Sequence, residues 1–179
     1  FDITNAPGQT NASCSGNPAA FTNNLSSMSG MSDNLLYNSS ACLVIATSPT
    51  LSKVLAPNSI VDGGVTQLTF TLTNSSTLPA QSDVRFTDNL PSYWRLADGV
   101  VANTCGGTVT DNSNAPLAAG STYVRLTGGS MAAGQSSCQI TVNITNQPGR
   151  LNATCSSTSS LWTNSSSRIS GLNNLFDGV

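Results

Sequence analysis

The sequence predicts an all-β fold, an antiparallel β-sandwich with irregular N- and C-terminal extensions. Three observations lead to this prediction. Apolar and polar residues alternate with a period of two in several short segments, as in strands that bury one face. Clusters of turn-forming residues separate these segments about every 8 to 15 residues. Glu is absent and Lys occurs once, although long exposed helices normally carry both residue types.

Residues 1–48 form the expected N-terminal extension. Turn signals such as Pro7-Gly8 interrupt residues 1–40, and the apolar residues between positions 28 and 37 allow one short helical turn. Residues 41–46 are continuously apolar and predict a buried strand. A break at Thr47-Ser48-Pro49 separates this strand from the region that follows.

The strands of the sandwich are expected from residue 49 onward. In residues 65–74, apolar side chains face one side and the threonines between them face the other, which is typical of a half-buried strand. Residues 137–145 repeat this pattern, and shorter strands are expected at 84–87, 123–127 and 150–154. The inward-facing residues of the two longest strands are Leu68, Phe70, Leu72, Cys138, Ile140, Val142 and Ile144.

The composition excludes several classes of function. Ser, Thr and Asn together make up 68 of the 179 residues, whereas charged residues make up 8%, and His is absent. Without His there is no imidazole base for Ser-His-Asp or Cys-His catalysis, and we expect no enzyme activity and no cofactor. One Lys and five scattered Arg provide no basic surface for nucleic acid. No apolar run is long enough to span a membrane.

The chain contains five cysteines, and their spacing indicates disulfides. No pair has the CxxC spacing of zinc or thioredoxin-like sites. Cysteines spread through a Ser/Thr/Asn-rich chain favour an oxidising compartment, and therefore a secreted, extracellular or cell-surface location. Because the count is odd, one thiol is free, bonds another chain or has its partner elsewhere.

Residues 49–155 carry an ordered series of short motifs. They are Pro49-x-Leu51-Ser52-Lys53, Pro57-Asn58-Ser59-Ile60, Gly63-Gly64, Leu68 to Asn74, Phe86-Thr87-Asp88-Asn89-Leu90-Pro91, Cys105-Gly106-Gly107-Thr108, Leu126-x-Gly128-Gly129, Gly134, Cys138 and Ile140 to Thr145. In order and spacing, this series resembles the immunoglobulin-like conserved-repeat domain of bacterial cell-surface proteins, a family catalogued as a domain of unknown function. The resemblance covers about 60% of the chain, at the usual size of one domain.

The resemblance implies an immunoglobulin-like two-sheet sandwich on a secreted or cell-surface protein. It also implies that Cys105 and Cys138 pair, and it assigns no catalytic residue. We further expect Cys14 to pair with Cys42, and Cys155 to remain unpaired or to bond another chain. The family usually occurs in repeats, whereas this chain holds one copy at 49–155, followed by a linker and apolar tail at 156–179.

Seven Asn-x-Ser/Thr sequons make N-linked glycans a candidate modification. Their number is close to what the composition gives by chance, so position carries more weight than count. Asn74 ends a predicted strand and Asn143 lies on an outward face, so we expect both to be accessible. The candidate acceptors are Asn11, Asn24, Asn38, Asn74, Asn143, Asn152 and Asn164.

Lys53 is the first of three candidates for chemistry in the sandwich. With Asp88 or an Asn it could close an isopeptide bond, but we expect an ordinary exposed lysine, because long charged side chains are usually exposed. Asp62 with its two glycines, and Asp111 with Asn112, are candidate calcium ligands. Turn formation is the favoured interpretation of both, since calcium needs about six to eight oxygen ligands.

A carboxylate pair and an aromatic pair complete the candidates. Asp83 and Asp88 are close enough in sequence to be weighed as a glycosidase pair. We instead expect Asp88 to lie in a turn that ends a strand. Trp94 beside Tyr93 could stack on a sugar ring, but packing is the favoured role.

The apolar flanks suggest assembly, because an unprotected sandwich edge can accept a strand from another chain. The favoured hypothesis is a structural subunit of a glycosylated extracellular fibre, self-associating into a homo-oligomeric filament through these flanks. The alternative is an adhesive or spacer module of a large cell-surface protein, which should be monomeric with its ends pointing outward. Apart from this, the flanks could simply fold back onto their own domain. The candidate assembly residues are Phe1, Ile3, Leu43, Val44, Ile45, Leu172, Leu175 and Phe176.

Overall fold

The structure is a computed structural model, and it describes residues 22–23, 41–42, 49–74, 80–152 and 160–177. The chain divides into two compact units, residues 1–47 and 48–179. In the first unit, β1 (Thr22–Asn23) pairs antiparallel with β2 (Ala41–Cys42). The predicted strand at 41–46 is therefore a strand at its first two residues, and its remainder lies outside the described residues.

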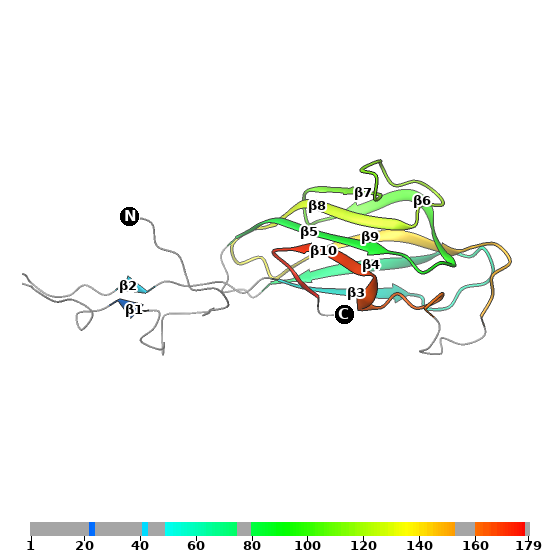
Figure 1. Cartoon of the computed structure of the whole chain (residues 1–179), viewed down its shortest axis with the longest axis horizontal. Helices are drawn as coiled ribbons and strands as arrows, with labels where there is room; N and C mark the ends of the chain where they lie inside the picture. The colour runs from blue at the N-terminus through cyan, green and yellow to red at the C-terminus, as the bar shows by residue number, and fades with distance from the viewer. Residues whose placement is uncertain (1–21, 24–40, 43–48, 75–79, 153–159, 178–179) are drawn as a thin grey trace, which may run out of the picture. The chain divides into compact units, whose positions relative to one another are not determined.

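The second unit is a sandwich of two sheets (Figure 1). The five-stranded sheet has the order β11-β3-β4-β9-β6, and the four-stranded sheet has the order β10-β5-β8-β7. All neighbours are antiparallel except β11 and β3, which run parallel. The strands are β3 (Thr50–Ala56), β4 (Thr66–Thr73), β5 (Gln81–Asn89), β6 (Trp94–Asn103), β7 (Thr108–Thr110), β8 (Tyr123–Met131), β9 (Ser137–Asn146), β10 (Ile169–Asn173) and β11 (Phe176–Asp177).

The alternating pattern places the core between the two sheets. Leu68, Phe70 and Leu72 of β4 are buried, and the threonines between them are half-buried or exposed. The inward residues of β9 are buried in the same way, and Phe70 meets Phe86 of the opposite sheet with their ring centroids 5.1 Å apart. The prediction of an all-β sandwich is confirmed, because burial of alternate side chains requires a second apolar layer against each sheet.

The sandwich extends further toward the C-terminus than the sequence predicts. Residues 150–152 form no strand, whereas β10 pairs with the outer edge of β5 and β11 pairs with the start of β3. Figure 1 shows β10 in red lying along β5. Residues 169–177 are thus two further strands of the sandwich and not an apolar tail. No helix in the described part of the chain is long and apolar enough to cross a membrane.

Candidate functional site: lysine, aspartate and asparagine between the sheets

Lys53 lies on the inward face of β3. The residues before and after it on this face are Leu51, which is fully buried, and Leu55, which packs against the core. Side chains on one face of a strand recur every second residue, so this register directs Lys53 toward the opposite sheet. Its side chain is 3% exposed. The expectation of an ordinary exposed lysine is therefore wrong, because the register of β3 outweighs the general preference of lysine for solvent.

Asp88 faces Lys53 from the other sheet. It lies near the end of β5, on the same face as Val84 and Phe86, and its side chain is fully buried. The expectation that Asp88 lies in a turn after a strand is wrong. The correction follows from pairing: Asp88 is opposite Val124 of β8 on one side and Ile169 of β10 on the other, so β5 is a central strand at this point.

Asn164 completes the cluster. It lies two residues before the short 3-10 helix η3 (Ser166–Arg168), which leads into β10, and it is half-buried. Because β10 pairs with β5, the segment before β10 is held close to Asp88. The three side chains therefore come from β3, from β5 and from the segment that precedes β10. We call them the Lys–Asp–Asn cluster.

The contacts within the Lys–Asp–Asn cluster form a closed ring. Lys53 Nζ donates to Oδ1 of Asp88 at 2.9 Å and to Oδ1 of Asn164 at 2.7 Å. Asn164 Nδ2 donates to Oδ2 of Asp88 at 2.6 Å. A further hydrogen bond joins Lys53 Nζ to the main-chain oxygen of Ser165 at 2.9 Å. One carboxylate thus contacts both the amine nitrogen and the amide nitrogen, and the amine contacts the amide oxygen.

Burial determines the protonation of Asp88. Removal from water is the largest influence and raises the pKa of this carboxyl above its ordinary value. The charge and hydrogen bond of Lys53, the hydrogen bond of Asn164 and the charge of Arg168 act in the opposite direction and offset this only in part. Asp88 therefore keeps its proton to a higher pH than an exposed aspartate does.

A pocket of about 520 Å³ opens beside the cluster. Lys53 and Asn164 line it together with Leu55 of β3, and Trp94 and Trp162 contribute aromatic surface. The ring of Trp162 packs against Tyr93, with centroids 5.2 Å apart, and the guanidinium of Arg150 lies 4.8 Å from the centre of the Tyr93 ring. Trp94 packs against the core, so the aromatic pair of the sequence has packing partners within the domain.

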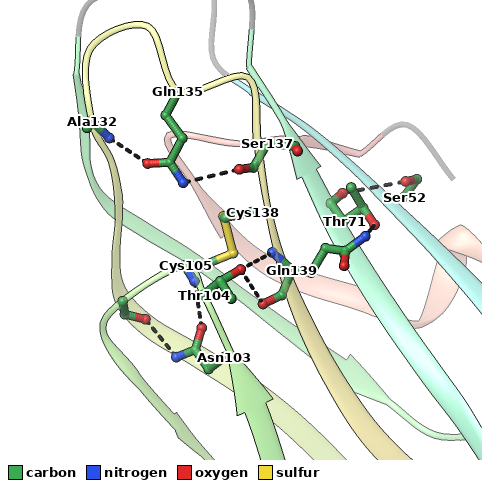
Figure 2. The surroundings of a disulfide bond; sticks show 11 residues. Ser52, Thr71, Asn103, Thr104, Cys105, Ala132, Gln135, Ser137, Cys138 and Gln139 are labelled. Carbon is green, nitrogen blue, oxygen red and sulfur yellow. Dashed lines mark hydrogen bonds between the residues drawn. A yellow bond between two sulfur atoms is a disulfide. The ribbon is translucent and has the colours of Figure 1, made fainter.

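The disulfide between Cys105 and Cys138 is formed, with its sulfur atoms 2.07 Å apart (Figure 2). Cys138 lies on β9, and Cys105 lies in the connection that leaves β6 in one sheet for β7 in the other. Both are buried. Around them, Thr104 N donates to the main-chain oxygen of Gln139, and Gln139 N donates to the Thr104 hydroxyl, both at 2.8 Å. The pairing implied by the family resemblance is confirmed.

The remaining cysteines and several sequons lie outside the described part of the structure. Cys14, Cys155, Asn11, Asn24 and Asn38 are not described, so the expected Cys14–Cys42 bond and the unpaired Cys155 stay predictions. Cys42 is the last residue of β2.

The described sequons differ in access. Asn74 is 4% exposed, and among the described residues neither atom of its amide has a hydrogen-bond partner. The expected accessibility of Asn74 is therefore wrong, because the residue that follows β4 still faces inward. Asn143 is half-buried and donates to Asp98, whereas Asn152 is exposed. Asn164, another of the candidate glycan acceptors, has its amide within the Lys–Asp–Asn cluster.

The candidate calcium residues form separate turns. Asp111 Oδ1 accepts hydrogen bonds from Ser113 N, Ser113 Oγ and Ala115 N, and these bonds, led by that of the Ser113 hydroxyl, lower the pKa of Asp111. Asp62 accepts a hydrogen bond from Asn146 Nδ2 at 2.5 Å. Within the described residues, no three acidic or cysteine side chains gather as metal ligands would.

The two carboxylates considered as a glycosidase pair are in different environments. Asp83 is about half exposed and pairs with Arg85, whereas Asp88 is buried.

Of the assembly residues, only the three near the C-terminus are described. Leu172 is partly exposed in β10, Leu175 is buried in the core, and Phe176 pairs with Thr50 through β11. This segment folds onto its own domain. Phe1, Ile3, Leu43, Val44 and Ile45 lie outside the described residues.

Asn164 is the site residue that sequence reasoning missed. Its sequon drew attention to glycans, and nothing local connects it with a lysine 111 positions earlier. A signal for Lys53 did exist, because Leu51 and Leu55 flank it at the spacing of one strand face. That pattern alone predicts an inward lysine, and an inward lysine requires buried acceptors nearby.

The fold and the sulfur bridge define the class of this protein as an all-β sandwich domain closed by a buried disulfide. The chain belongs to the family described as Domain of unknown function (DUF7933), whose profile matches residues 49–173. The match runs from just before β3 to the last residue of β10, so it contains the whole Lys–Asp–Asn cluster and both bonded cysteines. A search of curated proteins found no match.

Proposed function

We propose that this domain is a structural module of a large secreted cell-surface protein, acting there as a spacer or adhesive support. The observation that carries the proposal is that the sandwich is closed by its own C-terminal segment. Leu175 is buried in the core, and β10 and β11 add one strand to each sheet. A domain completed in this way folds without a strand from a neighbour, as a module repeated along a surface protein must.

The disulfide and the surface support an extracellular setting. A buried disulfide persists where the surroundings are oxidising, as they are outside the cell. Charged residues make up only 8% of the chain, and the outward rows of β4 and β9 consist largely of threonines and amides. Such a surface suits covalent glycans, for which exposed Asn152 is the best placed described acceptor. Glycosidase treatment that leaves the mass of the native protein unchanged would exclude N-linked glycans.

A fibre subunit is the second candidate, and one observation favours it. On the outer side of β3, the described residues of β11 pair with Thr50 and Leu51, and Val54 further along is 63% exposed. Lys53, Val54 and Leu55 in this stretch of β3 line the pocket beside the cluster. The apolar run at residues 41–46 of a second copy has the length and composition of a strand that could add to this edge.

One experiment distinguishes the two candidates. The full chain, produced with its disulfides, is examined by light scattering and negative-stain electron microscopy. A monomer at all concentrations supports the module. Filaments support the fibre subunit, provided that Leu43→Asp with Ile45→Asp abolishes them and that Thr47→Asp, which adds a charge at a neighbouring polar position, leaves them intact. Filaments that survive the double substitution would contradict assembly through residues 41–46.

A further inference from the structure

The only lysine in the chain is buried in the Lys–Asp–Asn cluster, which is unusual for this residue type. Burying an ammonium and a carboxylate costs several kcal/mol each in lost hydration. Their mutual attraction offsets this desolvation cost only when the geometry is good. A buried ion pair is therefore weak evidence of a stabilising role. The presence of a third group, a primary amide in contact with both partners, calls for a different explanation.

We propose that Lys53 and Asn164 join in an intramolecular isopeptide bond, and that Asp88 is the catalytic residue for this reaction. Lys53 Nζ is the nucleophile and the side-chain carbonyl carbon of Asn164 is the electrophile. The hydrogen bond of 2.7 Å between Nζ and Oδ1 of Asn164 holds the amine directly at the amide group that it attacks.

The reaction balances with these three residues alone. Lys53 first transfers a proton to the Asp88 carboxylate and becomes a neutral amine. Nζ then bonds to the Asn164 carbonyl carbon, the bond from that carbon to Nδ2 breaks, and Asp88 carries one proton from Nζ to the departing nitrogen. Ammonia leaves and takes up the proton first accepted by Asp88, so one lysine ammonium and one amide become one secondary amide and one ammonium ion. No oxidant, metal or cofactor takes part.

The geometry of Asp88 suits both proton transfers. One carboxylate oxygen lies 2.9 Å from the attacking nitrogen, and the other lies 2.6 Å from the departing nitrogen. General acid–base catalysis requires this reach to both atoms. Burial, which raises the pKa of Asp88, also favours the neutral amine and acid over the separated charges. The side chains of Lys53 and Asp88 are 3% and 0% exposed, so little water competes for their protons.

Intact mass spectrometry tests the proposal. The full chain is produced in a host that adds no glycans, then reduced and alkylated. The expected mass is about 17 Da below the mass calculated from the sequence, because attack by the lysine amine releases one molecule of ammonia. Because Lys53 is the only lysine, a reagent for amines should then label the N-terminus alone. Trypsin should fail to cleave after Lys53 and should release residues 1–85 joined to residues 151–168.

Two substitutions should restore the full mass. Lys53→Arg keeps the positive charge but removes the nucleophile, and Asp88→Asn keeps the shape but removes the proton carrier. Asn152→Ala, which removes a different amide from the same tryptic peptide, should still lose about 17 Da. Cooperative urea unfolding shows which variants are folded. Where a variant does not fold, the mass of the unsubstituted chain alone decides whether the bond between Lys53 and Asn164 forms.

Two results would overturn the proposal. The first is a folded chain of full mass with a reactive lysine amine. The second is a loss of about 18 Da, the mass of water, with the cross-link mapped to Asp88, because that bond would make Asp88 the electrophile. Retention of the ammonia loss in folded Asp88→Asn would contradict the catalytic role of Asp88.

Discussion

Gly106 and Gly107 follow Cys105 and turn the chain from one sheet into the other. Both have positive φ, at 64° and 66°. Gly107 is also packed against β8, where a Cβ would collide with the Thr127 carbonyl oxygen and lie 2.7 Å from the Gly129 nitrogen. A single missing carbon therefore allows the disulfide-bearing connection to approach β8 closely.

Gly107→Ala should lower the free energy of unfolding by about 3 kcal/mol, since the left-handed conformation costs about 1 to 2 kcal/mol and the collision adds to it. Gly149→Ala is the matched control, with φ 71° and open space around a new Cβ. It should cost about 1 kcal/mol. Urea denaturation of both variants provides the comparison. Equal losses of unfolding free energy would mean that the collision with β8 does not contribute to the destabilisation.

Asp88 gives the sandwich a characteristic dependence on pH. Its pKa is raised in the folded state, so over the window above the ordinary value of 3.8 the folded chain binds more protons than the unfolded chain. The free energy of unfolding contributed by Asp88 therefore falls as pH rises through this window. Asp88→Asn should remove this fall, which urea denaturation between about pH 3 and 7 measures as a difference in slope. A steeper fall in the variant than in the original chain would mean that the pKa of Asp88 is lowered by folding instead of raised.

At the scale of elements, strands with strict alternation were predictable and the others were not. β4 and β9 bury every second residue in the pattern that the sequence shows. β10 has mostly exposed residues, and β11 is two residues long, so neither carries a periodic signal. Their pairing depends on β5 and β3, which lie far away in the sequence. Lys53 was recognisable as a candidate, but its partners depend on how the sheets face each other.

The connection between β6 and β7 depends on its disulfide. The bond closes a loop with a sequence separation of 33 residues, and restricting such a loop in the unfolded chain stabilises the fold by about 4 kcal/mol. Replacing Cys105 and Cys138 together by Ala should lower the free energy of unfolding by about 2 to 5 kcal/mol. Fluorescence of Trp94, at the start of β6, and of Trp162, which packs against Tyr93, follows the transition.

Added reductant provides the control for the disulfide. It should lower the stability of the original sandwich toward that of the double variant and leave the variant unchanged. A reductant effect of the same size on both proteins would place the stabilisation at some other pair of cysteines.

In the whole sandwich, the first and the last strand along the chain lie in the same sheet. β3 is its first strand and β11 is its last, and they lie side by side with Phe176 opposite Thr50 and Asp177 opposite Leu51. The Lys–Asp–Asn cluster connects this sheet with the other one, since Lys53 belongs to β3 and Asp88 to β5. The sandwich is thus held together at its first and last strands.

The parallel direction of β3 and β11 determines how the domain responds to tension. If the chain is pulled from both ends, the two strands are drawn past each other lengthwise, and their hydrogen bonds must break together instead of one at a time. A covalent bond between Lys53 and Asn164, whose sequence separation is 111, would carry the force past the residues between them. If those residues unravelled, they would lengthen the chain by about 380 Å, and the bond would prevent this extension.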